Sequence, residues 1–198
     1  MIIHVIGGFL GSGKTTLLIK IAEQYIRAGK KVTILVNEIG DIGVDGKTIG
    51  GTGLNSIELE QGCICCSLAG TLQSTMRQIE SEFSPDVLII EPTGLALPHK
   101  VREIIRGTVE EDEVSTIGII DAFRFRLLCG KKEEFMTMQL SKSDVVWVNK
   151  IDVADQDMVS ESVDWVRGIC RPRTPVFLVS GKTGEGLEQA CAESLFLK

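Results

Sequence analysis

Two short segments of this 198-residue chain combine residue types at spacings that support chemistry. The first is GCICC at residues 62–66, which places Cys63, Cys65 and Cys66 close together. Their sulfur atoms could bind a thiophilic metal ion, form a redox site or a disulfide, or lie in a core as small apolar groups. The second is GFLGSGKTT at residues 8–16, whose glycines and lysine are typical of loops that wrap phosphate groups.

The glycine-rich segment matches the pattern G-x-x-x-x-G-K-[ST] and follows an apolar run, IIHVI, at residues 2–6. An amphipathic segment comes next, so strand, loop and helix stand in the order that a phosphate-binding loop requires. Lys14, which we expect in a solvated pocket, can reach the β- and γ-phosphates, and the Thr15 hydroxyl can hold Mg²⁺. Backbone N–H groups and the helix N-terminus then face the anion. The residues expected to bind nucleotide here are Gly8, Gly11, Ser12, Gly13, Lys14, Thr15 and Thr16.

An acidic residue ends a later apolar run. Glu91 follows DVLII at residues 86–90 and begins the sequence Glu-Pro-Thr-Gly. At the carboxyl end of a strand beside the phosphate loop, its carboxylate can hold Mg²⁺ through water, and the Gly94 N–H can reach a γ-phosphate. An acidic loop residue without a catalytic role is the alternative. Together with the lysine and threonine of the phosphate loop, Glu91 forms the expected catalytic set.

The sequence NKID at residues 149–152 follows the apolar run DVVWV and indicates which base is bound. Asp152 can accept hydrogen bonds from guanine N1–H and the N2 amino group, whereas adenine has neither donor there. A site that leaves such a carboxylate unpaired rejects the wrong base strongly. Asn149 can connect the loops, and the Lys150 stem can lie on the base plane. The loop SGKTGEG after the last run can give an N–H to guanine O6 and adds Ser180, Gly181 and Lys182 as expected contacts. We therefore predict GTP rather than ATP.

Composition narrows the class of protein. The net charge is −6 and 24% of residues are charged. This composition does not resemble the basic composition of a nucleic-acid binder. The N-terminus lacks the features of a signal peptide, and no apolar run is as long as a membrane span. We therefore expect a cytoplasmic protein without nucleic-acid or membrane partners, whose six cysteines are thiols or metal ligands.

The remaining cysteines and the two histidines are isolated in the sequence. We expect Cys129, Cys170 and Cys191 to be small buried apolar side chains. His4 lies inside the first apolar run and is expected in the core. His99 is a weaker candidate for a metal ligand.

Short apolar runs alternate with longer amphipathic segments, which predicts an α/β fold of three layers with a mostly parallel sheet in one domain of residues 1–198. The expected strands are residues 2–6, 31–36, 86–90, 115–120, 144–148 and 176–179. The expected helices are residues 14–28, 67–82, 99–107, 132–142, 157–170 and 185–196.

The segment of residues 37–62 fits neither pattern, because it is long, rich in glycine and too polar for a core. We expect it to be a mobile functional segment. Asp41 and Asp45, both within it, are our guesses for the residue that orients a water toward the γ-phosphate; Asp41 completes the expected catalytic residues.

Five motifs in one order, GFLGSGKTT, NEIGD, GCICC, EPTG and NKID, resemble the CobW-like branch of the P-loop GTPases, which includes the nickel-insertion GTPases HypB and UreG. The resemblance covers nearly the whole chain. It implies a Mg²⁺-dependent GTPase that carries or inserts a transition metal, with Zn²⁺, Co²⁺ or Ni²⁺ at the C-x-C-C segment. It also implies a client metalloprotein and a nucleotide- or metal-dependent homodimer as partners. Many relatives carry a second C-terminal domain, which we expect this chain to lack or another chain to supply.

The residues of the cysteine segment are consistent with a metal. Neighbouring side chains of a strand point to opposite faces, so Cys65 and Cys66 can bind one ion only from a turn, which Gly62 allows. Cys63 adds a third sulfur. The fourth ligand is expected to be water or Glu38, which matches the acidic position of the family's N-E-x-G motif.

We therefore predict a GTP-binding and GTP-hydrolysing metallochaperone. The first alternative is a GTPase switch that acts on a corrinoid-dependent or other cofactor-dependent enzyme without carrying metal. The second is a small-molecule kinase, against which the guanine motif argues.

Overall fold

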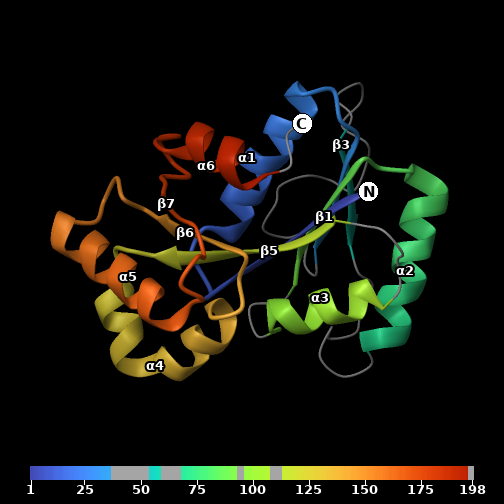
Figure 1. Ribbon diagram of the computed structural model, residues 1–198. Coiled ribbons are helices and arrows are strands. Elements are labelled where there is room, and N and C mark those ends of the chain that lie inside the picture. Colours follow the sequence, from blue (N-terminus) through green and yellow to red (C-terminus); the bar gives the residue numbers. More distant parts are fainter. Residues whose placement is uncertain (37–53, 59–67, 93–95, 108–112, 196–198) are drawn as a thin grey trace.

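The computed structural model describes residues 1–36, 54–58, 68–92, 96–107 and 113–195. These residues form a seven-stranded sheet in the order β3-β2-β4-β1-β5-β6-β7, and every neighbouring pair of strands is parallel. The predicted three-layer α/β fold is confirmed (Figure 1). The strands are β1 (Ile2–Gly8), β2 (Val32–Val36), β3 (Leu54–Glu58), β4 (Val87–Glu91), β5 (Glu113–Asp121), β6 (Val145–Asn149) and β7 (Val176–Leu178).

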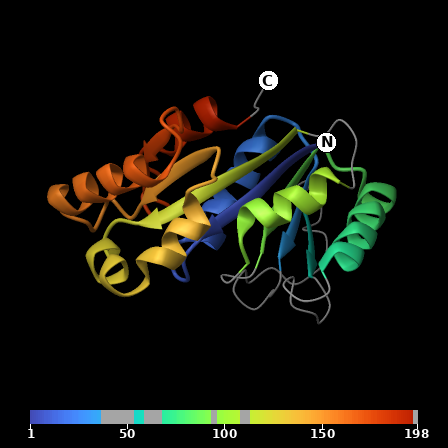
Figure 2. The ribbon, with the colours of Figure 1, turned by 60° about the horizontal axis from the view of Figure 1, so that its bottom comes forward.

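Helices cover both faces of the sheet, as buried parallel strands require. Helices α1 and α6 pack on one face, and the other face carries α2, α3, α4 and α5 (Figure 1). In Figure 2, α3 lies between α2 and α4 along this second face. No helix in the described part of the chain is both long and apolar enough to cross a membrane. The helices are α1 (Lys14–Arg27), α2 (Leu68–Phe83), α3 (Pro98–Arg106), α4 (Phe125–Leu140), α5 (Gln156–Ile169) and α6 (Leu187–Ser194).

The two edge strands differ from the sequence-based prediction. Strand β3 lies within residues 37–62, where we predicted no regular element, and it pairs in parallel with β2. Its sequence LNSIE contains polar residues, which an edge strand tolerates because it is not covered by a strand on both sides. Strand β7 occupies the opposite edge and is half-exposed, whereas its apolar sequence is typical of a strand buried on both faces.

Helix α4 begins at Phe125, seven residues before the predicted start at residue 132. The backbone is not helical at Lys132, so two helical segments meet at a kink. Gly130 precedes this kink and is a weak helix former, which explains why the sequence pattern showed only the second segment. The first segment therefore packs against α5 through Phe125, which contacts Trp165.

The position of α1 follows from its apolar residues. Leu17, Leu18, Ile21 and Tyr25 recur at helical spacing and are all fully buried against the sheet. Burial of each such side chain contributes about 1.5–3 kcal/mol. This face holds the N-terminus of α1 at the carboxyl end of β1, where the phosphate loop begins.

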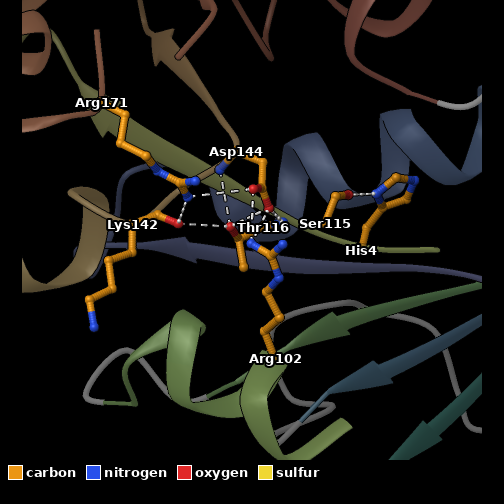
Figure 3. Close-up of polar contacts among 7 residues, drawn as sticks. All are labelled: His4, Arg102, Ser115, Thr116, Lys142, Asp144 and Arg171. Atoms are coloured by element: carbon orange, nitrogen blue, oxygen red, sulfur yellow. Dashed lines mark hydrogen bonds and ion pairs between the residues drawn. The ribbon is translucent and has the colours of Figure 1, made fainter. Parts of the chain in front are cut away.

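A charged cluster fixes α3 to the amino edge of the sheet, opposite the phosphate loop (Figure 3). Asp144 precedes β6 and accepts two hydrogen bonds from Arg102 Nη1, at 2.8 and 2.7 Å. Its Oδ2 also accepts from the N–H and hydroxyl of Thr116, at 2.8 and 2.9 Å. Arg171 lies 3.7 Å from the same carboxylate. One carboxylate thus joins α3, β5 and the segment after α5.

His4 is fully buried in β1, as expected for a core residue. Its Nδ1 lies 2.6 Å from Ser115 Oγ and its Nε2 lies 2.6 Å from Tyr25 Oη (Figure 3 shows the Ser115 contact). Burial lowers the pKa of His4 from 6.5 to about 4, because the charged ring would lose its hydration. The folded protein therefore holds this ring neutral at pH values where an unfolded chain protonates it.

We predict that acidification from pH 6.5 to 4 destabilises the protein through His4. The unfolded chain takes up a proton near pH 6.5, whereas the folded chain resists it until about pH 4, so the lost stability reaches roughly 3 kcal/mol. Urea denaturation of wild type and of His4→Gln across this range measures the effect. The difference between them should shrink by this amount on acidification, and parallel curves would contradict the account. Gln78→Leu, at an exposed residue that does not titrate, is the control.

Candidate functional site

Four neighbouring strands bring polar residues to the carboxyl edge of the sheet. Strand β1 ends at Gly8, β4 at Glu91, β5 at Asp121 and β6 at Asn149. Because these strands are parallel, their last residues lie at the same edge, where open α/β sheets bind ligands. The loop of residues 9–13 crosses the middle of this row.

Glu91 contacts both functional side chains at the start of α1. Thr15 Oγ1 donates to Glu91 Oε2 at 3.0 Å, and Lys14 Nζ lies 3.7 Å from Glu91 Oε1. The Lys14 side chain is only 7% exposed, so our expectation that it lies in a solvated pocket is wrong. The reason is that Glu91 reaches it from the neighbouring strand and supplies an opposite charge.

The pairing of Thr15 and Glu91 fits a Mg²⁺ site. A hydroxyl and a carboxylate oxygen are the hard ligands that Mg²⁺ prefers, and the two groups already lie within hydrogen-bonding distance. The Glu91 side chain is 15% exposed, so it remains accessible from one side. These two residues could therefore hold the ion, and their role in Mg²⁺ binding stays a prediction.

The phosphate loop turns tightly at two glycines. Gly11 and Gly13 adopt φ values of 73° and 93°, in the left-handed region that favours glycine. A Cβ atom on Gly13 would collide with the Asn149 amide nitrogen. The Ser12 hydroxyl is buried and has no hydrogen-bond partner among the described residues. The loop therefore contains a donor that an anion or water can satisfy.

Asn149 connects the two loops that flank the site. Its Nδ2 donates to the Ser12 carbonyl at 2.8 Å, and its Oδ1 accepts from the Gly181 N–H at 2.9 Å. The side chain is buried, so both bonds are shielded from water. The sequence-based prediction that Asn149 connects these loops is confirmed.

Asp152 and the loop after β7 are held together by one hydroxyl. Ser180 Oγ donates to Asp152 Oδ1 at 2.7 Å and accepts from the Thr183 N–H at 3.0 Å. Asp152 is partly exposed, so the rest of its carboxylate is accessible to a ligand.

The other predicted contacts on this side lie on the surface or beside α1. Lys182 is exposed. Thr16 is also exposed, and its methyl group lies close to Gly181, so α1 and the loop after β7 touch here. A nucleotide bound to the phosphate loop would thus reach the loop of Ser180 without crossing the core.

A buried carboxylate that the sequence analysis missed supports the phosphate loop. Asp121 Oδ2 lies 2.7 Å from Lys150 Nζ and 2.6 Å from Arg124 Nε, and the carboxylate is fully buried. Lys150 Nζ donates to the Gly11 carbonyl at 2.8 Å, and Arg124 Nη2 donates to the Leu10 carbonyl at 2.9 Å. Asp121 therefore orients two cations that hold the outer side of the loop. We call Asp121, Arg124 and Lys150 the loop brace.

A local signal for part of the loop brace exists in the sequence. Asp121 ends an apolar run, and its Oδ1 accepts from the Arg124 N–H three residues later, at 3.0 Å. An aspartate that bonds the backbone of the following turn is a common way to end a strand. Lys150 has φ of 68°, an unusual value for a residue other than glycine. The Lys150 backbone thus turns away from β6, and its amine bonds Asp121 and the Gly11 carbonyl.

Several predicted site residues lie outside the described residues. They are Glu38, Asp41, Asp45, Cys63, Cys65, Cys66 and Gly94. Within the described ranges, no three His, Cys, Asp or Glu side chains are grouped so that they could hold a metal ion. The predicted roles of these residues therefore stay predictions.

The isolated cysteines are not all buried as predicted. Cys191 is buried, and burial raises its pKa to about 11, which disfavours the thiolate. Cys129 and Cys170 are half-buried, and burial raises the pKa of each. Both pack at the edge of the core around α4 and α5. His99 is partly buried on α3, and its pKa is lowered by burial and by the charge of Lys142.

Comparison with known proteins places this arrangement in a family. A family model described as CobW/HypB/UreG, nucleotide-binding domain, matches residues 2–178. The chain belongs to this family. The match includes the phosphate loop, Glu91 and the NKID segment.

Relatives of the CobW/HypB/UreG family resemble the chain in sequence and in structure. The zinc chaperone CobW of Sinorhizobium sp is 33% identical over 91% of this chain and 59% of its own length. The zinc chaperone YeiR of Escherichia coli strain K12 is 34% identical over 75% of this chain and 46% of its own length. The chain thus spans about half the length of these curated relatives.

The solved structures bear on the fold alone. The hydrogenase maturation factor HypB of Archaeoglobus fulgidus has a TM-score of 0.68 at 19% identity and covers 98% of this chain and 88% of its own. The Zn(II)-bound YjiA GTPase of E. coli has a TM-score of 0.65 at 22% identity, over 90% of this chain and 57% of its own. Both carry the same sheet architecture.

We predict that Asp121→Asn weakens both stability and nucleotide binding. The neutral amide leaves Arg124 and Lys150 without their shared counter-charge, which should cost about 1–3 kcal/mol because both cations are partly screened by water. Urea denaturation and nucleotide titration measure the two effects. Asp164→Asn, an exposed residue on α5, should change neither. Wild-type nucleotide affinity in a folded Asp121→Asn variant would show that the brace does not position the loop.

Proposed function

We propose that this protein binds and hydrolyses GTP and couples its nucleotide state to transition-metal binding or insertion in a client metalloprotein or cofactor pathway. The observation that carries the nucleotide assignment is the pair of bonds from Asn149 to Ser12 and Gly181. They hold a phosphate loop and a base-side loop at one edge of the sheet. A single nucleotide can then contact both.

Guanine is the base that this edge fits. The Asp152 carboxylate is oriented by Ser180, and one of its faces remains accessible. It can accept from guanine N1–H and N2–H together, and adenine would leave it unpaired. The backbone N–H groups of the Ser180 loop supply donors for guanine O6.

Hydrolysis requires that the charge of the transferred γ-phosphoryl group be neutralised. Lys14 lies at the start of α1, where its amine can leave Glu91 and contact the β- and γ-phosphates. Thr15 and Glu91 would hold Mg²⁺, directly and through water. When bound, Mg²⁺ supplies positive charge to the phosphate oxygens. Asp41 is the proposed residue that orients the attacking water.

The metal part of the proposal is supported by the names of relatives and by the cysteine segment. CobW and YeiR are named zinc chaperones, which favours Zn²⁺ over Co²⁺ and Ni²⁺ here. Cys63, Cys65 and Cys66 supply three sulfur ligands, and Glu38 is proposed as the fourth. Because Glu38 and the cysteines stand at opposite ends of the segment of residues 37–62, a rearrangement of that segment on γ-phosphate binding would alter the metal site.

We predict that Asp152→Asn weakens GDP binding by at least about 100-fold, because the amide cannot accept from both guanine donors. The variant should instead bind xanthosine diphosphate better than wild type does, since the new NH₂ group can donate to the xanthine 2-oxygen. Titration of both nucleotides measures this change. Asp157→Asn, on the first turn of α5, is the matched control. Unchanged GDP affinity would contradict the guanine assignment.

We predict that metal affinity depends on the bound nucleotide. Reduced protein is titrated with Zn²⁺, Co²⁺ and Ni²⁺ in the presence of GDP or a non-hydrolysable GTP analogue. Affinity should differ about 5- to 150-fold between the two states, and metal should alter nucleotide affinity by the same factor. Affinity should also fall as pH drops, because the thiols bind as thiolates.

Two variants and one control locate the metal. Cys65→Ser and Cys66→Ser should each lose it, whereas Cys129→Ser, at a half-buried thiol outside the segment, should retain it. No metal binding in either nucleotide state would favour a GTPase switch that carries no metal. Binding that ignores the nucleotide would leave only a structural metal site.

A further inference from the structure

One buried amide on α4 contacts two segments of the nucleotide site. Gln139 is 3% exposed, and its Nε2 donates to the Ala96 carbonyl at 2.8 Å. Its Oε1 accepts from the Gly8 N–H at 3.4 Å. A single side chain thus uses its donor on the segment before α3 and its acceptor on the end of β1.

The two partners occupy functionally distinct places. Gly8 is the last residue of β1 and the first of the phosphate loop. Ala96 stands two positions after Gly94, the last residue of the Glu91-Pro-Thr-Gly sequence. It is buried and lies just before α3 begins at Pro98. Gln139 therefore bridges the entrance of the phosphate loop and the exit of the segment that carries Glu91.

The helix that carries Gln139 is fixed to the phosphate loop by a second contact. Phe135, one turn earlier on α4, packs edge-on against Phe9, with ring centroids 6.0 Å apart. Phe135 and Gln139 both follow the kink at Lys132, so the C-terminal half of α4 makes both contacts. α3 packs against β1 nearby, where Pro98 fills the space beside Gly7. Gly8 and Ala96 thus both lie beside packed elements.

We propose that Gln139 is a positioning residue that couples the Glu91-Pro-Thr-Gly segment to the phosphate loop, so that the protein distinguishes GTP from GDP. The proposal rests on the proposed function, because it takes the γ-phosphate as the group that this segment senses. Gln139 does not touch the nucleotide. It fixes Ala96, which follows the Glu91 segment, relative to Gly8, where the phosphate loop starts.

A purely structural role makes a different prediction. If Gln139 only satisfies two buried backbone groups, its loss weakens the fold and affects all nucleotides alike. If it couples the segments, its loss affects the triphosphate state selectively, because only that state uses the position of the Glu91 segment. The ratio of affinities for the two nucleotides separates these roles.

The experiment compares Gln139→Met, which keeps the length of the side chain but makes neither bond, with wild type. Each protein is titrated with GDP and with a non-hydrolysable GTP analogue in the presence of Mg²⁺. The analogue should bind about 10-fold more weakly to Gln139→Met, while GDP affinity stays within about threefold. Gln78→Leu is the matched control, since Gln78 is an exposed glutamine on α2 that bonds Glu82.

Two further measurements cover other outcomes. Gln139→Asn keeps the amide on a shorter side chain and should give an intermediate ratio, which serves if Gln139→Met does not fold. In steady-state GTP hydrolysis, kcat should fall by a larger factor than KM rises.

The proposal is overturned if both nucleotides weaken equally in the variants or if neither changes. If wild type binds both nucleotides but releases no phosphate from GTP, hydrolysis in the proposed function fails, and the affinity ratio still decides the role of Gln139. Wild type that binds neither nucleotide would overturn both proposals.

Discussion

Asn149 holds together the parts of the molecule on which its chemistry depends. Two hydrogen bonds of its side-chain amide join Ser12 to Gly181, although Asn149 and Ser12 are 137 positions apart in the chain. The parallel sheet makes this possible, because β6 and β1 end at the same edge with only β5 between them. Since the amide is buried, each bond is shielded from water and costly to lose. The spacing between the phosphate loop and the base-side loop is therefore built into the folded protein before any nucleotide binds.

Two carboxylates stabilise opposite ends of the neighbouring strands β5 and β6. Asp121 ends β5 and orients Arg124 and Lys150 toward the phosphate loop, whereas Asp144 precedes β6 and binds Arg102 of α3. One edge thus holds a loop that must fit a ligand, and the other holds the helix that follows the Glu91 segment.

The sequence predicted the parts of the site that are local in the chain. The phosphate loop, Glu91 and the NKID residues each lie beside an apolar run, so motif and element could be read together. Gln139 and the brace contact of Arg124 left no such pattern, because their partners lie 131 and 114 positions away. Strand β3 was missed because its polar sequence is acceptable only at the edge of a sheet, which the sequence does not reveal. The burial of Lys14 was missed because it depends on Glu91 of a neighbouring strand.

In the proposed function, a guanine nucleotide binds at the carboxyl edge of the sheet, and its state controls metal binding. Every later step requires that the nucleotide be recognised by its base. The most direct measurement is displacement of a fluorescent GDP derivative from wild-type protein by unlabelled GDP, GTP, ADP and ATP with Mg²⁺. The account predicts that GDP and GTP displace the probe at concentrations at least about 100-fold lower than ADP and ATP do. Displacement by ADP at the same concentration as GDP would contradict it.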